Sequence, residues 1–250
     1  MVYKLIFITL LLFTSIVKAS SYETGLLAYD SGDYKKAYKI FETLANDGDD
    51  KAQSFLGLML ETGTGVKKDL EKSYKWILKS ANQGNAGAMY ALGMAYFTGH
   101  SYPKKDVSKA KEWFLKAATK GEFFSHYELA GMAIDQKNYF DSVNWLRKAS
   151  TFEFSESDGL AYKKLIEVWH NLGMSYLKGF GVRKDYYAAS IWFKRSANAG
   201  FASSQLMLGI MYSRGMGVSQ SPNEANYWYG LACDNKLQDG CDMYNPGQSR

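Results

Sequence analysis

The stretch from Ala52 to Gly84, AQSFLGLMLETGTGVKKDLEKSYKWILKSANQG, has a pattern that returns along the chain. A Leu-Gly pair is followed by a glycine-rich turn, by a tryptophan 19 residues after the glycine, and by Ala-x-x-Gly. The pair recurs at intervals of 36, 80 and 36 residues, and the interval of 80 holds a degenerate copy, Leu129-Ala130. Agreement of several independent offsets predicts an internal structural repeat. The pairs are Leu56-Gly57, Leu92-Gly93, Leu172-Gly173 and Leu208-Gly209.

Each copy predicts two helices joined by a glycine-containing loop. In the first helix, apolar or small residues recur at a spacing of three and four, as at Ala88, Leu92, Ala95 and Tyr96, which is the stripe of an amphipathic helix. Glycine within that helix costs about 1 kcal/mol relative to alanine, so its recurrence predicts that a neighbouring backbone or aromatic ring lies close to it. The second helix begins at a capping residue such as Asp69 or Ser221. We therefore expect an all-α chain.

Two copies and one junction depart from the pattern. The copies Tyr22–Gly48 and Phe123–Ser150 lack the Gly-x-Gly-Val loop and keep only a tight turn between their helices. After the second of them, we expect a loop over Thr151–Asp158 and an over-long first helix over Gly159–Lys178.

This pattern resembles the Sel-one-like repeat, a subgroup of the tetratricopeptide superfamily, and Ala52–Gly84 and Ser204–Gly240 reproduce most of its signature. The resemblance implies an α-solenoid, a right-handed superhelix of about six stacked helix-turn-helix repeats whose neighbours cover each other's apolar faces. We expect one such domain over residues 20–250. Its repeats would span residues 22–48, 50–85, 86–122, 123–150, 159–200 and 201–240, with a C-terminal cap over 241–250.

Residues 1–19 are predicted to form a secretory signal peptide. Lys4 precedes an apolar run from Leu5 to Val17, and the small residue Ala19 fits a cleavage site. The run is too short to span roughly 30 Å of hydrocarbon, although an uncleaved anchor is the alternative. The mature chain would begin near Ser20, in the periplasm or outside the cell, with no membrane insertion after cleavage.

Composition and charge limit the kinds of partner. The chain has 250 residues with 46% hydrophobic and 16% aromatic content, which excludes an intrinsically disordered chain. The formal net charge of +5 falls to about +3 without Lys4 and Lys18, and the lysines are scattered instead of forming a basic stripe. We therefore expect no nucleic-acid partner. The chain is also expected to be a monomer that binds another protein and to need no cofactor.

The two cysteines, Cys233 and Cys241, lie eight positions apart across the junction between the last second helix and the following helix. In secreted cysteine-rich members of the family, cysteines in these positions join adjacent helices, so the resemblance implies a Cys233–Cys241 disulfide. Closing this loop would stabilise the terminal repeat by about 2.5 kcal/mol in the chain-entropy model. The alternative is two buried free thiols.

Few residues indicate chemistry. His100, His126 and His170 are isolated in different repeats, so no metal site is predicted. Ser-x-x-Lys, the opening motif of penicillin-recognising enzymes, occurs as often as chance allows, without Lys-Thr-Gly or Ser-Asp-Asn. We predict no catalytic residues and no enzyme. The alternatives are an enzyme or ligand binder acting on cell-wall or β-lactam compounds, and a structural factor in envelope assembly.

The first helices of the repeats are expected to line a concave groove. Residues opposite their core stripe include adaptable methionines and aromatics, which peptide-binding surfaces use, although many could instead pack against the next repeat. The resemblance implies an exported scaffold or adaptor that binds a protein segment, in a specific form an immunity or regulatory protein in the periplasm. The predicted protein-binding residues are Leu58, Tyr90, Met94, Phe97, Tyr127, His170, Met174, Leu177, Ile210 and Arg214.

Overall fold

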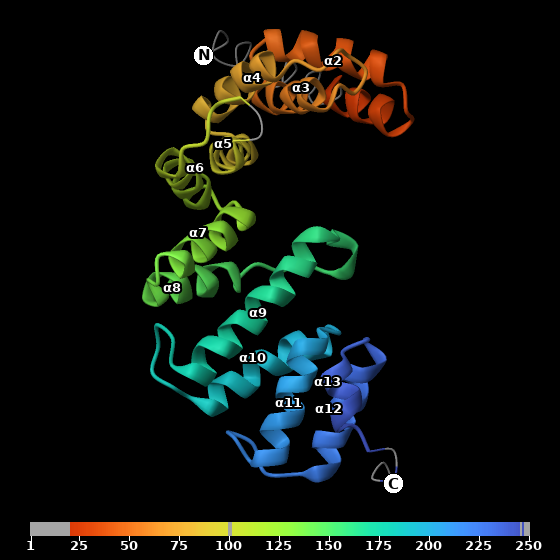
Figure 1. The fold of residues 1–250 in the computed structure, drawn as a ribbon. Coiled ribbons are helices and arrows are strands. Elements are labelled where there is room, and N and C mark those ends of the chain that lie inside the picture. The colour runs from red at the N-terminus through yellow and green to blue at the C-terminus, as the bar shows by residue number, and fades with distance from the viewer. Residues whose placement is uncertain (1–20, 100–101, 246, 248–250) are drawn as a thin grey trace, which may run out of the picture. The chain divides into compact units, whose positions relative to one another are not determined.

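The computed structural model describes residues 21–99, 102–245 and 247, and helices connected by loops and turns make up this part of the chain (Figure 1). The predicted signal peptide, residues 1–19, lies outside the described residues. Contacts divide the chain into two compact units, Met1–Glu122 and Phe123–Arg250, here called unit 1 and unit 2. Inside each unit the helices pack on their neighbours in sequence, as in a repeat solenoid. The all-α prediction is confirmed.

Unit 1 is built from successive helix pairs of nearly constant length. Pairing is closest between α3 and α4 and between α5 and α6, while α2 with α3 and α4 with α5 link one pair to the next. Phe41, Leu56 and Phe114 are fully buried in its core. The elements are a helix over residues 21–30, α2 (Tyr34–Asn46), α3 (Asp50–Thr62), α4 (Leu70–Asn82), α5 (Ala86–Thr98) and α6 (Val107–Thr119).

Unit 2 contains the departures from the regular repeat. Helix α9 has 19 residues where most helices of the chain have 13, and it packs on α7, α8 and α10. The expected loop over Thr151–Asp158 includes one 3-10 turn, and Gly159 precedes α9 as its N-cap instead of lying inside it. The elements are α7 (Phe123–Asp135), α8 (Tyr139–Ala149), η1 (Glu156–Asp158), α9 (Leu160–Lys178), α10 (Tyr186–Asn198), α11 (Ala202–Arg214), α12 (Pro222–Asp234) and α13 (Gln238–Met243).

The glycine of each Leu-Gly pair makes room for a side chain of the second helix. A Cβ placed on Gly173 would lie 2.7 Å from the ring of Phe193, and one on Gly57 would lie 2.5 Å from Ile77. Gly93 faces the ring of Phe114 in the same way. Since contacts this short do not occur in real proteins, only glycine lets the two helices pack as they do. The predicted close approach is confirmed.

The second glycine of the Gly-x-Gly-Val loop joins one repeat to the one before it. A Cβ on Gly65 would collide with the carbonyl oxygen of Tyr34, at the start of α2. Gly181 meets Tyr139, at the start of α8, in the same manner. Each full loop therefore rests on the backbone at the beginning of the preceding repeat's second helix. The copy at the start of unit 2 has no such loop.

Candidate protein-binding groove in unit 1

Two adjoining hollows lie over α3, α4 and α5 of unit 1. They have volumes of about 430 and about 330 Å³, and they share Glu61, Ile77 and Ala91, so they form one depression, called here the α3–α5 groove. The larger hollow is lined by Glu61, Leu70, Ser73, Tyr74, Ile77, Tyr90, Ala91, Leu92, Met94, Ala95, Thr98 and Tyr102. The smaller is lined by Tyr22, Lys51, Ser54, Phe55, Leu58, Glu61, Ile77, Asn85 and Ala91.

Small side chains on the first helices create the space. Ser54 on α3 and Ala91 and Ala95 on α5 stand where larger residues would fill the depression. The half-buried side chains of Tyr90 and Met94 form an apolar wall beside them. Volumes of this size, lined mainly by apolar groups with few polar ones, are typical of sites that accept a side chain or a small molecule.

A tyrosine cluster closes one end of the groove. The Tyr74 and Tyr96 hydroxyls share a hydrogen bond of 2.9 Å, and the Tyr102 ring stands edge-on to Tyr74 with centroids 5.2 Å apart. Burial, together with the hydrogen bond shared with Tyr96, raises the pKa of Tyr74 above its ordinary value, so its hydroxyl stays neutral at physiological pH. Because Tyr102 is 52% exposed, its ring is free to contact a ligand.

Glu61 is an acidic residue in the lining of both hollows. Its side chain is half-buried, and within the described part of the chain it has no hydrogen-bond or ion-pair partner. Asp50, at the start of α3, accepts a hydrogen bond from the Asn85 amide at 2.9 Å. Lys51 lines the other end and is exposed. The groove therefore offers one negative and one positive group on largely apolar walls.

Four of the predicted binding residues lie in unit 1. Leu58, Tyr90 and Met94 line the α3–α5 groove. Phe97 is half-buried and packs edge-on against Phe114, with ring centroids 6.3 Å apart. The prediction left out Glu61, Tyr74 and Tyr102. Glu61 lies one helical turn beyond Leu58 on the same face of α3, which is the signal that could have identified it.

Two of the predicted residues in unit 2 are engaged by internal polar contacts. The Tyr127 hydroxyl donates to Glu167 at 2.5 Å, and the Lys164 ammonium donates to the same carboxylate at 2.9 Å. His170 Nδ1 lies 2.8 Å from the Ser204 hydroxyl. Burial lowers the pKa of His170 to about 4, so the ring is neutral at physiological pH.

The other predicted residues of unit 2 differ in burial. Met174 and Leu177 are half-buried and pack against the core cluster of α10 and α11 that contains Leu208. Ile210 is half-buried, and Arg214 is exposed at the end of α11. Met174 and Leu177 thus contribute to the packing of unit 2, whereas the Arg214 side chain is open to solvent.

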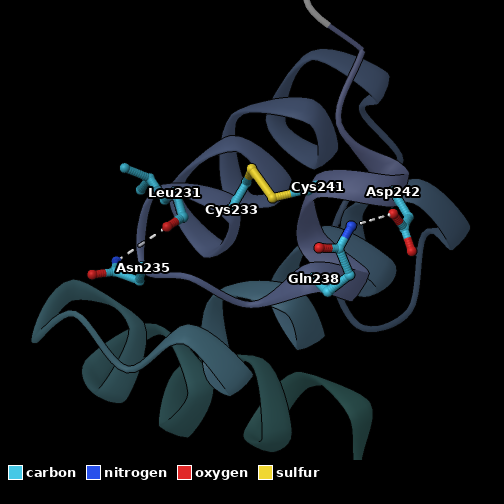
Figure 2. The surroundings of a disulfide bond; sticks show 6 residues. All are labelled: Leu231, Cys233, Asn235, Gln238, Cys241 and Asp242. Atoms are coloured by element: carbon cyan, nitrogen blue, oxygen red, sulfur yellow. Dashed lines mark hydrogen bonds between the residues drawn. A yellow bond between two sulfur atoms is a disulfide. The ribbon is translucent and has the colours of Figure 1, made fainter.

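The cysteines form a disulfide that fastens the last helix (Figure 2). Cys233 near the end of α12 is bonded to Cys241 on α13, with their Cα atoms 4.5 Å apart. Gly240 is buried so close to α12 that a Cβ on it would lie 2.6 Å from the Ala232 methyl. Helix α13 thus covers the end of α12 and is held there covalently.

The described residues contain neither a cluster of metal ligands nor a helix suited to a bilayer. In residues 21–99, 102–245 and 247, no three His, Cys, Asp or Glu side chains come together in a way that could hold a metal ion. None of the helices over those residues has the length and apolar character needed to cross a bilayer. His100 lies outside them. In one of the Ser-x-x-Lys motifs, the Ser175 hydroxyl donates to the Asn171 carbonyl at 2.9 Å.

Comparison with known proteins places this geometry in a family. The Sel1 repeat profile matches residues 19–49, 50–85, 86–122, 170–201 and 202–237. The chain is 27% identical over 207 residues to the Sel1-repeat-containing protein YjcO of Escherichia coli strain K12, over 80% of this chain and 85% of YjcO. It is 26% identical over 234 residues to chitin synthase regulatory factor 3 of Schizosaccharomyces pombe, over 79% of this chain.

A solved structure shows the same fold. The crystal structure of c5321, a protective antigen present in uropathogenic Escherichia coli strains, resembles this chain with a TM-score of 0.79 and 28% identity, over 93% of this chain. The chain spans 52% of the length of c5321 and 25% of the length of the yeast regulatory factor.

Proposed function

Because this chain belongs to the Sel1 repeat family, we propose that it is an exported, non-enzymatic scaffold that binds a segment of another protein in the α3–α5 groove. The groove carries this proposal. It is an open depression on the first helices of two consecutive repeats, walled by Leu58, Tyr90 and Met94 and free of a catalytic set of side chains within its lining. Methionine and aromatic side chains adapt their shape to a bound apolar segment.

Export to the periplasm is supported by the disulfide and by the predicted signal peptide. A Cys233–Cys241 bond persists in an oxidising compartment and would be reduced in the cytosol. An immunity or regulatory role toward the bound protein is the form that the family resemblance favours. Recovery of the chain from a periplasmic fraction, with an N-terminus at Ser20, is the expected result. Recovery with Met1 intact in the membrane fraction would contradict cleavage and export.

Substitutions in the groove test the binding role. We expect Leu58→Glu and Met94→Glu to abolish capture of at least one envelope protein that the unmodified chain captures, because a carboxylate would be buried against an apolar ligand. Leu115→Glu is the matched control, since Leu115 is 36% exposed on α6 while Leu58 is 44% exposed on α3. The measurement is quantitative mass spectrometry of pull-downs from a periplasmic extract. Identical captures by all three variants would refute binding in the groove.

A further inference from the structure

We infer that the α3–α5 groove selects a protein segment in which an arginine or lysine adjoins an apolar side chain, and that Glu61 is the residue that determines this specificity. The inference rests on the proposed binding function and adds the chemistry of the partner. It follows from the position of Glu61, from the rings around it and from the distribution of charge along the groove.

Glu61 occupies a position that is unfavourable without a cation. It lies in the last turn of α3, which ends at Thr62 and has no basic residue in that turn. The partial negative charge of the helix C-terminus disfavours a carboxylate there. The side chain is also half-buried, lines both hollows, and has no polar partner among the described residues. A basic side chain from a ligand would compensate for both the helix end and the lost hydration.

The surroundings of Glu61 favour a guanidinium in particular. Tyr74, Tyr90 and Tyr102 line the same hollow of about 430 Å³. Arginine pairs with a carboxylate through two parallel hydrogen bonds while its planar face stacks on an aromatic ring, and lysine makes only a point contact. An apolar neighbour of the arginine would lie against Met94 and Ala95 in that hollow.

Lys51, at the opposite end of the groove, limits where a bound segment can carry basic residues. Lys51 precedes Glu61 by ten residues on α3, which is about 15 Å at the rise of an α-helix. An extended ligand covers that distance with four to five residues. Because Lys51 would repel a second cation, the selected segments should carry their basic residue at one end and no basic residue four to five positions away.

A selection from random peptides tests this specificity. The purified full chain, with its disulfide intact, is used to enrich a phage-displayed library of random octapeptides, and one enriched peptide is then made with its basic residue replaced by leucine. We expect enrichment of peptides with arginine or lysine beside an apolar residue. Glu61→Gln should weaken the basic peptide about tenfold or more and leave the affinity of the leucine peptide unchanged. Glu61→Lys should enrich acidic peptides instead.

Glu112→Gln is the control, because Glu112 is an exposed carboxylate on α6 that lines neither hollow. Thermal melts of all variants establish that each is folded. Enriched peptides without basic residues, or equal effects of Glu61→Gln and Glu112→Gln, would overturn the specificity and leave the binding function standing. If the unmodified chain enriched no peptide at all, both the specificity and the binding function would fall.

Discussion

Replacing Gly173 with alanine should destabilise the protein even though alanine is the better helix former. Gly173 lies within α9, and a Cβ there would lie 2.7 Å from two ring carbons of Phe193, whose side chain is completely buried. Overpacking of this kind costs about 1–3 kcal/mol. The gain in helix propensity returns about 1 kcal/mol. We therefore expect the free energy of unfolding to fall by up to about 2 kcal/mol.

Gly131→Ala provides the matched control in the same unit. Gly131 lies inside α7, is exposed, and has no atom within 4 Å of where its Cβ would be. This substitution should raise the free energy of unfolding by about 0.5–1 kcal/mol. Urea unfolding followed by circular dichroism measures both changes. If Gly173→Ala were as stable as Gly131→Ala, the close packing of the first helix on the Phe193 ring would be refuted.

Two further predictions concern unit 2. The double substitution Cys233→Ala/Cys241→Ala should lower the free energy of unfolding by about 2.5 kcal/mol, and reductant should then have no further effect; an equally stable variant in urea titrations would contradict the role of the disulfide. His170, whose pKa burial lowers to about 4 from an ordinary 6.5, should make stability depend on pH. Between pH 4 and 6.5, His170 binds a proton in the unfolded state but not in the folded state. The contribution of the neutral ring to the free energy of unfolding is therefore complete above pH 6.5 and is lost as the pH falls toward 4, by roughly 2 kcal/mol between pH 7 and 5. His170→Gln should remove that component in urea titrations at the two pH values, and an unchanged pH dependence would exclude His170 as its source.

The repeat architecture was predictable because it rests on local constraints. The recurring glycine faces a side chain 20 or 21 residues later on the paired helix, as Gly173 with Phe193 and Gly93 with Phe114 illustrate, so a single period reveals both helices and their packing. The disulfide followed from the family resemblance at the last junction. The face of the first helices likewise placed Leu58, Tyr90 and Met94 at the groove.

The sequence pattern did not predict the side-chain contacts between residues that lie far apart in the chain. Tyr127, one of the predicted binding residues, donates a hydrogen bond to Glu167, which the extended helix α9 brings to its hydroxyl from 40 residues later in the chain. His170 meets Ser204 across a similar separation. For Glu61 the decisive property is that none of the described residues forms a hydrogen bond or ion pair with it, which only the three-dimensional arrangement shows. Helical periodicity identifies the face of a residue and leaves its distant neighbours undefined.

The resting of Gly65 on Tyr34, and of Gly181 on Tyr139, bears on how such chains change length during evolution. Each contact joins the loop of one repeat to the helix start of the repeat before it, 31 residues back for Gly65 and 42 for Gly181, and a full repeat carries one such loop and one such helix start. A duplicated block would bring a compatible donor and a compatible acceptor, so an added copy would meet its neighbours through an interface that already exists. The chain between Tyr139 and Gly181 is 11 residues longer than the chain between Tyr34 and Gly65, and the contact is kept, so residues can also be added between the two positions when the loop still reaches the helix start.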